Sequence, residues 1–221
     1  MTSAKDRPAV PPDTIVLPDL TPFEGAALEP DGDYDALEFA DLDLGGQVAE
    51  NARFRDCRFE RCRLDGLAMP RVRISDCLVT DTQATGIDAS ESTWRDSILS
   101  GGRIGALTAP GAVWTGIRVR GGKLNFVDLT TARLTDVVFE SCTIGELDLG
   151  DAQLHSVRFV ECTIDDLSVE GARLTRVDLS RATLHLVRGI ASLRGATVGR
   201  DQLLELAPLL AEHLGIAIAE D

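Results

Sequence analysis

Apolar residues recur at every fifth position through about two thirds of the chain. The series begins at Phe39 and ends at Leu184, and all thirty of its members are apolar. A second series, two residues before the first, holds mostly small or apolar residues and includes all five cysteines. No Asp, Glu, Lys or Arg occupies either series. Every charge between Leu37 and Leu186 therefore falls on the other three positions of a pentad.

A period of five matches neither a helix, with about 3.6 residues per turn, nor a strand, with about 2.0. A coil that turns a corner after each pentad does match it, because two of its five side chains then point inward. Four sides close a square, so residues i and i+20 stack. Backbone hydrogen bonds between coils satisfy the peptide groups at about the 4.8 Å spacing of a sheet. The sequence therefore predicts an all-β solenoid.

Side-chain volume supports this stacking. Trp94 and Trp114 are twenty residues apart and share one wall of the predicted coil. The preceding centres are Ala89 and Ala109, and Ala84 lies across the coil. A densely packed interior requires such an exchange of large for small residues.

Several pentads show a small residue, a polar residue, Leu or Phe, and two further residues that are mostly polar. Good copies are Ala52–Asp56, Cys62–Gly66, Ala132–Asp136, Ala152–Ser156 and Ala172–Arg176. This pattern resembles the pentapeptide-repeat family, with its consensus A-(D/N)-L-x-x, over about two thirds of the chain and without insertions. The resemblance implies a right-handed quadrilateral β-helix. The functional relatives it suggests are the topoisomerase-interacting proteins of the Qnr and MfpA type.

Three regions follow from the repeat. Residues 1–34 hold six of the nine prolines and many acids, which predicts an irregular N-terminal arm. The arm either shields the edge of the first coil, with Ile15–Leu17 and Phe23 docked there, or is disordered. Residues 35–200 form the pentapeptide-repeat β-helix, in which the register slips by one around Gly189.

Residues 201–221 form a C-terminal cap or dimerisation element. Leucines recur there at three- and four-residue spacings, which is an amphipathic helical pattern, and Pro208 should kink or divide the helix. The closure is either a monomeric cap or a two-fold dimer made through the leucine face, as comparable elements form in relatives implied by the resemblance. The candidate contacts are Leu203, Leu206, Leu210 and Leu214.

Composition excludes several classes of function. The formal net charge of −14 disfavours direct binding of nucleic acid or of an anionic membrane. No apolar run reaches the roughly 20 residues of a membrane span, and the first residues are not signal-like, so we expect a cytoplasmic protein. The five cysteines are scattered, which favours free thiols over a disulfide framework.

The sequence contains no recognisable catalytic apparatus. His155 and His185 are thirty residues apart and should lie on opposite walls, and His213 lies near the end of the terminal helix. No Cys/His cluster has zinc spacing, no phosphate-binding motif follows a strand, and no nucleophile has a base beside it. We therefore expect no enzyme activity, no metal and no cofactor.

Exposed charge is the remaining signal, and it comes in bands. Residues 134–170 hold nine acidic residues against one arginine, and Glu146 and Asp166 should stack directly as a like-charge pair. The candidate acidic binding surface consists of Asp136, Glu140, Glu146, Asp148, Asp151, Glu161, Asp165, Asp166 and Glu170.

Two functions compete. The first is a non-enzymatic scaffold for protein–protein interaction, with an unidentified partner and a possible homodimer through the C-terminal helix. The alternative, implied by the resemblance, is a DNA mimic that modulates a type II topoisomerase, DNA gyrase, and confers quinolone tolerance, a form of antibiotic resistance. The arginine-rich bands interrupt any long negative face, which counts against the alternative.

Overall fold

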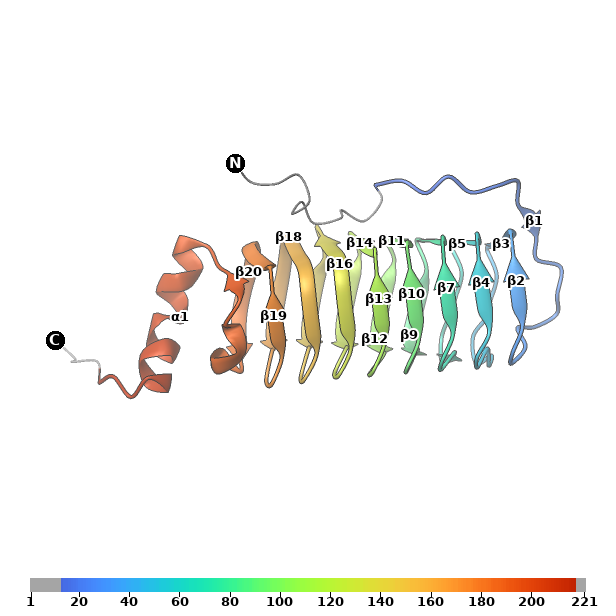
Figure 1. Ribbon diagram of the computed structural model, residues 1–221. Coiled ribbons are helices and arrows are strands. Elements are labelled where there is room, and N and C mark those ends of the chain that lie inside the picture. Colours follow the sequence, from blue (N-terminus) through green and yellow to red (C-terminus); the bar gives the residue numbers. More distant parts are fainter. Residues whose placement is uncertain (1–12, 218–221) are drawn as a thin grey trace, which may run out of the picture.

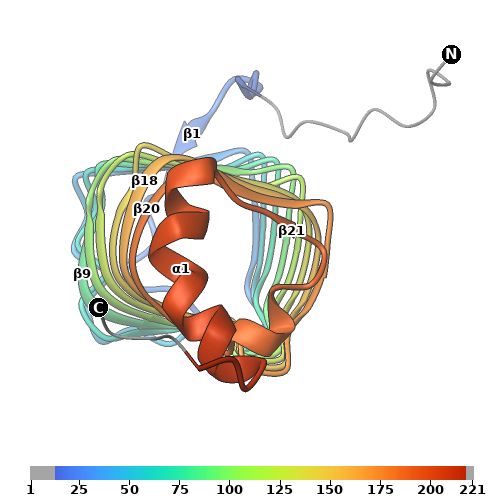
Figure 2. The same ribbon diagram turned by 90° about the vertical axis from the view of Figure 1, so that its left-hand side faces the viewer.

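The computed structural model describes residues 13–217 and shows a rod of stacked square coils (Figures 1 and 2). All the strands pair in parallel, and through most of the rod the partners are twenty residues apart: Trp94 pairs with Trp114, and Trp114 with Leu134. The predicted all-β solenoid is confirmed.

The rod has four walls. We number them in chain order and define each by the pentad centres that it contains. In steps of twenty, wall 1 runs from Tyr34 to Leu174, wall 2 from Phe39 to Leu179, wall 3 from Leu44 to Leu184 and wall 4 from Ala49 to Val169. Tyr34 already belongs to the first coil, so the regular structure begins slightly before the boundary expected from the repeat.

Short strands form the first two walls, and longer ones turn a corner toward the C-terminal end. Wall 1 contains β2 (Asp33–Asp35), β4 (Arg53–Arg55), β7 (Arg73–Ser75), β10 (Thr93–Arg95), β13 (Val113–Thr115), the starts of β16 (Arg133–Glu140) and β18 (Gln153–Ser168), and β19 (Arg173–Thr175). Wall 2 contains β3 (Leu37–Ala40), β5 (Arg58–Glu60), β8 (Leu78–Thr80), β11 (Ile98–Ser100), β14 (Arg118–Arg120), later parts of β16 and β18, and the start of β20 (Val177–Arg188).

Most strands of wall 3 continue into wall 4. They are β9 (Gln83–Asp88), β12 (Arg103–Thr108), β15 (Lys123–Asp128), β17 (Thr143–Asp148) and the ends of β18 and β20. In the earlier coils wall 4 has only β6 (Leu67–Ala68), and wall 3 has isolated bridges such as that between Asp43 and Arg63.

The pentad centres line a dry interior. Phe39, Phe54 and Leu134 are each at most 2% exposed, and the rings of Phe39 and Phe59 stack with centroids 4.5 Å apart. Leu99 is only half-buried but still packs against the core. The inward position of the predicted series is thus correct along the rod.

Most corners place one residue of the pentad in the left-handed backbone region. This residue comes two after the centre, with φ of +63° at Asn51, +53° at Asp56 and +69° at Gly101. Turns of this kind favour Gly, Asn and Asp, which explains the polar residue at that position. Gly102 is needed for a different reason, because a Cβ there would lie 2.3 Å from the carbonyl oxygen of Thr82.

The N-terminal arm closes the first coil. β1 (Thr21–Pro22) pairs in parallel with β3, and Thr21 N–H donates to the carbonyl oxygen of Ala36 at 3.0 Å. The ring of Phe23 packs on those of Phe39 and Tyr34, with centroids 4.6 and 5.9 Å away. Of the two alternatives for the arm, docking at the first coil is confirmed for Phe23. For Ile15–Leu17 it is wrong, because the neighbouring Asp13 pairs with Arg118, several coils further along wall 2.

The C-terminal end closes by a slip and a helix. Val177 pairs with Ala196 of β21 (Ala196–Thr197), nineteen residues away, after the short 3₁₀ helix η1 (Ile190–Leu193). Helix α1 (Arg200–His213) then lies across the open end of the rod (Figure 2). Pro208 lies inside this single helix, so the expected division into two helices is wrong.

Candidate interaction surfaces

The predicted acidic residues are distributed around several walls rather than along one. Glu146 and Asp166 lie at the corner between walls 3 and 4 and are direct neighbours in adjacent coils, as predicted. Glu140 and Glu161 lie at the edge of wall 2 and the corner after it. The nine acids therefore encircle the rod.

Arg188 bridges the stacked pair and offsets part of its negative charge. Its Nη2 lies 3.0 Å from Glu146 Oε1, and its Nε lies 2.9 Å from Asp166 Oδ1. These hydrogen bonds, to Asp166 first and then to Glu146, raise the pKa of Arg188. The like-charge contact predicted from the repeat is real, but an arginine from the last coil offsets it.

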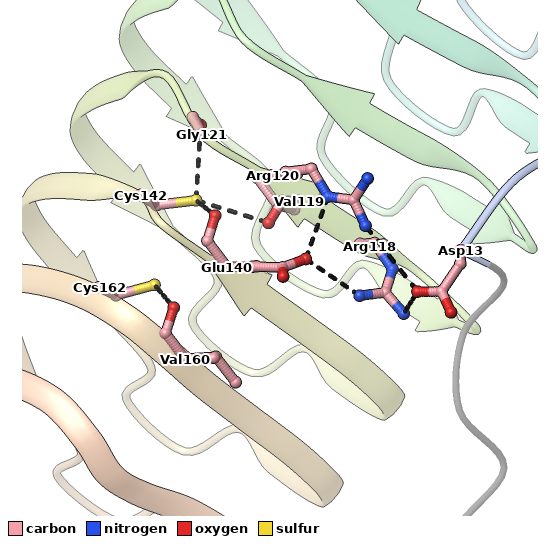
Figure 3. Close-up of polar contacts among 9 residues, drawn as sticks. All are labelled: Asp13, Arg118, Val119, Arg120, Gly121, Glu140, Cys142, Val160 and Cys162. Atoms are coloured by element: carbon pink, nitrogen blue, oxygen red, sulfur yellow. Dashed lines mark hydrogen bonds and ion pairs between the residues drawn. The ribbon is translucent and has the colours of Figure 1, made fainter.

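Glu140 is held by two arginines (Figure 3). Its Oε2 lies 3.1 Å from Arg118 Nη1 and 3.0 Å from Arg120 Nε. Burial opposes ionisation of this carboxyl, but the hydrogen bonds from Arg120 and Arg118 outweigh it, so the pKa of Glu140 is lowered. Glu140 therefore works inside a charge cluster rather than as a free acidic contact.

Two further acids have partners one coil away. Glu161 Oε1 lies 2.7 Å from Arg181 Nη2, and Asp165 Oδ1 lies 3.1 Å from His185 Nδ1. His155 lies on wall 1, opposite His185, and contacts Arg176. The two histidines do not form a pair.

Four predicted acids have no ion pair within residues 13–217: Asp136, Asp148, Asp151 and Glu170. Asp148 has a local structural role, since its Oδ1 accepts the N–H of Gly150 at 2.9 Å. Asp136 and Asp151 occupy corners with φ of +52° and +55°. Only Glu170 lacks such a local explanation.

Ion pairs between stacked residues explain the charge bands. Arg55 makes two 2.9 Å hydrogen bonds to Asp35, and Arg61 two of 2.7 Å to Asp41, each across twenty residues. An acidic coil therefore lies on a basic one, and the bands neutralise each other along the rod axis. Five of the nine predicted acids likewise have an arginine or histidine partner, so the predicted acidic surface does not consist of unpaired carboxylates alone.

The structure divides the predicted leucine face of α1. Leu206 is 7% exposed against the last coil and is a cap contact, whereas Leu210 is only half-buried: part of it packs against the core and the rest is exposed. Leu203 and Leu214 are 48% and 68% exposed and face outward. The sequence did not single out Leu204, which is 70% exposed, because it falls outside the three- and four-residue spacing.

Sequence reasoning also missed a strip on wall 2. Leu78, Ile98, Arg118 and Val138 occupy an outward position, one before the pentad centre, yet Ile98 and Val138 are buried. The signal was present, since apolar residues at a position otherwise often charged indicate an external cover. Which segment covers them could not be read from the pattern.

All five cysteines are free and buried. Cys57 and Cys77 stack in adjacent coils, where Cys57 N–H donates to Cys77 Sγ at 3.4 Å. The hydrogen bond with Cys57 and burial raise the pKa of Cys77. Within residues 13–217 no group of three His, Cys, Asp or Glu side chains is placed to hold a metal ion, and no helix is long and apolar enough to cross a membrane.

Comparison with known proteins adds to this geometry only at the level of fold. No family model and no curated protein matches the chain. The unbroken pentad register, with four walls and a twenty-residue coil, decides the assignment. The fold is that of a pentapeptide-repeat protein.

Solved structures of such solenoids are similar in fold to this chain. Full-length QnrB1, described as a plasmid-mediated fluoroquinolone resistance protein, is 18% identical with a TM-score of 0.30, over 84% of this chain and 100% of its own. HetL, a pentapeptide-repeat protein involved in heterocyst differentiation regulation in the cyanobacterium Nostoc sp., is 17% identical with a TM-score of 0.24, over 79% and 93%. At these scores the likeness carries no functional argument.

Proposed function

We propose that this protein is a non-enzymatic scaffold for protein–protein interaction and that it works as a two-fold dimer joined through α1. The observation that carries the proposal is an apolar seam on α1 that joins the half-buried Leu210 to the exposed Leu203 and Leu214.

The seam has the spacing of a helix–helix contact. Leu203, Ala207, Leu210 and Leu214 follow one another at intervals of four, three and four residues. Apolar residues at these alternating intervals fall on one stripe of a helix and interdigitate with the same stripe of a partner. The inner side of α1 is a different stripe, in which Leu206 and Gln202 contact the last coil.

A second copy of this chain fits the seam because the seam can match itself. In an antiparallel pair centred between Ala207 and Leu210, Leu203 of one copy meets Leu214 of the other, and the small Ala207 faces Leu210. Such a contact uses the same patch on both subunits, as two-fold dimers require. Since α1 lies across the end of the rod (Figure 2), two rods would meet end to end.

The test is the molar mass of the chain in solution, by light scattering during size-exclusion chromatography. We expect twice the 23.7 kDa of one chain, and the mass of one chain for Leu203→Glu/Leu214→Glu. Leu186→Glu is the matched control, because Leu186 is also 48% exposed but lies outside α1. Leu206 is unsuitable, since its substitution would disturb the cap itself. A monomeric wild-type chain at tens of micromolar would overturn the dimer.

The alternative is a DNA-mimicking modulator of DNA gyrase. Its support is the four acids that have no ion pair within residues 13–217, and against it stands the pairing of four others with arginines and of Asp165 with His185. A gyrase supercoiling assay with and without a quinolone separates the two functions. We expect no response to wild-type protein and none to Arg188→Gln, which frees Glu146 and Asp166. Inhibition that Arg188→Gln strengthens would establish mimicry instead.

A further inference from the structure

Wall 2 carries side chains that point out of the coil and are nevertheless buried. The strip is a column of in-register neighbours, one residue from each of four coils: Leu78, Ile98, Arg118 and Val138. Ile98 is 6% exposed, Arg118 5% and Val138 3%, although Ile98 and Val138 are not part of the interior core. An outward side chain can lose its contact with solvent only if something outside the coil covers it.

The N-terminal arm lies outside wall 2, along the part of this strip that runs from Arg118 to Leu78. Residues 13–22 run along the outside of the rod from the level of β14 to β1, beside β3 (Figure 1). Val16 is 93% exposed, whereas Ile15 and Leu17 are half-buried. This alternation is that of an extended segment with one side against a surface.

A carboxylate anchors the far end of the arm. Asp13 Oδ1 lies 2.6 Å from Arg118 Nη2 and 3.8 Å from Arg120 Nη2 (Figure 3). Glu140 holds the same two guanidinium groups from the next coil, at 3.1 and 3.0 Å. The arginine pair is therefore positioned by the rod itself, and it presents donors to a carboxylate arriving from outside.

The arm is attached by side chains rather than by a strand ladder. Within the described part of the chain, residues 13–20 make no backbone hydrogen bond to wall 2, and the first is that of Thr21 N–H to Ala36. A segment held in this way can leave without breaking sheet hydrogen bonds. Another segment with the same side chains can take its place.

We propose that the wall 2 strip is a binding site for an extended segment of another protein, and that residues 13–17 occupy it in cis. The segment is recognised by a carboxylate followed two and four residues later by aliphatic side chains, as in Asp13-Thr-Ile15-Val-Leu17. The carboxylate binds Arg118 and Arg120, and the aliphatic side chains cover Ile98 and Leu78. Because the arm is tethered, it competes at an effective concentration of about millimolar, so a partner binds only when the arm is displaced. The site is distant from α1 and does not depend on the dimer.

The test uses the full chain with the arm released. The variant Ile15→Ser/Leu17→Ser keeps β1 and Phe23, so the first coil stays closed. The probe is a fluorescein-labelled peptide of residues 11–20, PPDTIVLPDL, and binding is followed by fluorescence anisotropy. We expect the released variant to bind this peptide at least tenfold more tightly than wild type. The same peptide with Asp13→Asn should bind roughly tenfold more weakly, because a charged hydrogen bond is lost.

A second variant releases the arm by a different substitution, in case the double variant fails to fold. Asp13→Arg changes one side chain that is 76% exposed and should release the arm by repulsion from Arg118 and Arg120. Failure of the peptide to bind either variant, with far-ultraviolet circular dichroism like that of wild type, would overturn the proposal. Equal binding to wild type and both variants, or undiminished binding of the Asp13→Asn peptide, would overturn it as well. Molar mass is measured separately, so a failure of the α1 dimer is distinguishable.

Discussion

Trp94 and Trp114 occupy the same position in adjacent coils, with ring centroids 5.8 Å apart, yet only one indole N–H has a partner. Trp94 Nε1 donates to Ser92 Oγ at 3.0 Å. Twenty residues later Ala112 stands where Ser92 stands, and Trp114 Nε1 is buried without an acceptor. The two tryptophans therefore form a matched pair, in which the indole N–H of Trp94 has an acceptor and that of Trp114 has none.

We predict that Ala112→Ser stabilises the fold by about 1 kcal/mol, because it supplies the missing acceptor to Trp114. The new hydroxyl can itself donate to the carbonyl two residues earlier, as Ser97 does to Arg95 at 2.7 Å. Urea unfolding followed by tryptophan fluorescence measures the change. Ser92→Ala is the reciprocal control and should lower the free energy of unfolding by about 1 to 2 kcal/mol. A loss of stability in Ala112→Ser would show that the site has no room for the hydroxyl.

The sequence predicted the stacking of Trp94 on Trp114, because period five allows one register and any shift would expose apolar centres. It predicted the contact between Glu146 and Asp166 for the same reason. It could not predict Arg188 as their partner, since a long side chain reaches 42 residues back in the chain, across two coils. The period determines whether a side chain points into or out of the coil, but it does not determine which residues a long, flexible side chain reaches.

The cover on wall 2 illustrates a second limit. The pattern places Ile98 outside the coil, and the structure agrees. That residues 13–22 lie over it depends on an arm with no repeat, so no register relates the two. The sequence indicates such an irregular segment only through the apolar residues of the surface that it covers.

The arm also bears on the acidic surface. Asp13 binds the same two arginines as Glu140. A residue from the predicted irregular arm therefore balances a cluster that would otherwise carry a net positive charge. Charges counted along the sequence represent each coil by itself. In the rod, charge is balanced between coils and between the arm and the wall.

Asp76 should make the fold more stable as the pH falls. Partial burial and the neighbouring carboxylates of Asp56 and Asp96 raise the pKa of Asp76. The folded state then binds this proton more tightly than the unfolded chain, so ionised Asp76 destabilises the fold at pH 7. This destabilisation disappears as the pH falls through the raised pKa of Asp76 in the folded state and then below its pKa in the unfolded chain, about 3.9.

We therefore predict that Asp76→Asn is more stable than wild type at pH 7 by about 0.5 kcal/mol, and that the gain shrinks toward pH 4. Asparagine keeps the left-handed corner, where φ is +54°. Asp136→Asn is the control, because the column neighbours of Asp136 are Gly116 and Ser156, which carry no charge. Urea unfolding at both pH values gives the comparison. A gain that does not change with pH would mean that repulsion is not its cause.

Arg188 should stabilise the last coils through the two carboxylates it bridges. Arg188→Gln leaves Glu146 and Asp166 as an unrelieved like-charge pair, and we expect a lower urea midpoint than wild type at low salt. The loss should diminish at 1 M NaCl, because exposed charges are screened. In a Glu146→Gln background the same substitution should cost less, since the repulsion is already gone. Equal costs in the two backgrounds would show that Arg188 acts through packing alone.

The cysteines should be inert in the folded protein and reactive only when it unfolds. All five are buried, and the thiolate is the species that reacts with a disulfide reagent. Two of them, Cys77 and Cys142, do not ionise readily, because hydrogen bonding to the stacked Cys57 and Cys162 and burial raise their pKa values. We predict that Ellman's reagent at pH 8 labels no thiol of the native chain within minutes and all five in 8 M urea. Thr183→Cys, on the exposed face of wall 3, should add one fast thiol and so verify the assay. Fast labelling of a native cysteine would indicate that a coil opens locally, and the site of labelling would identify which one.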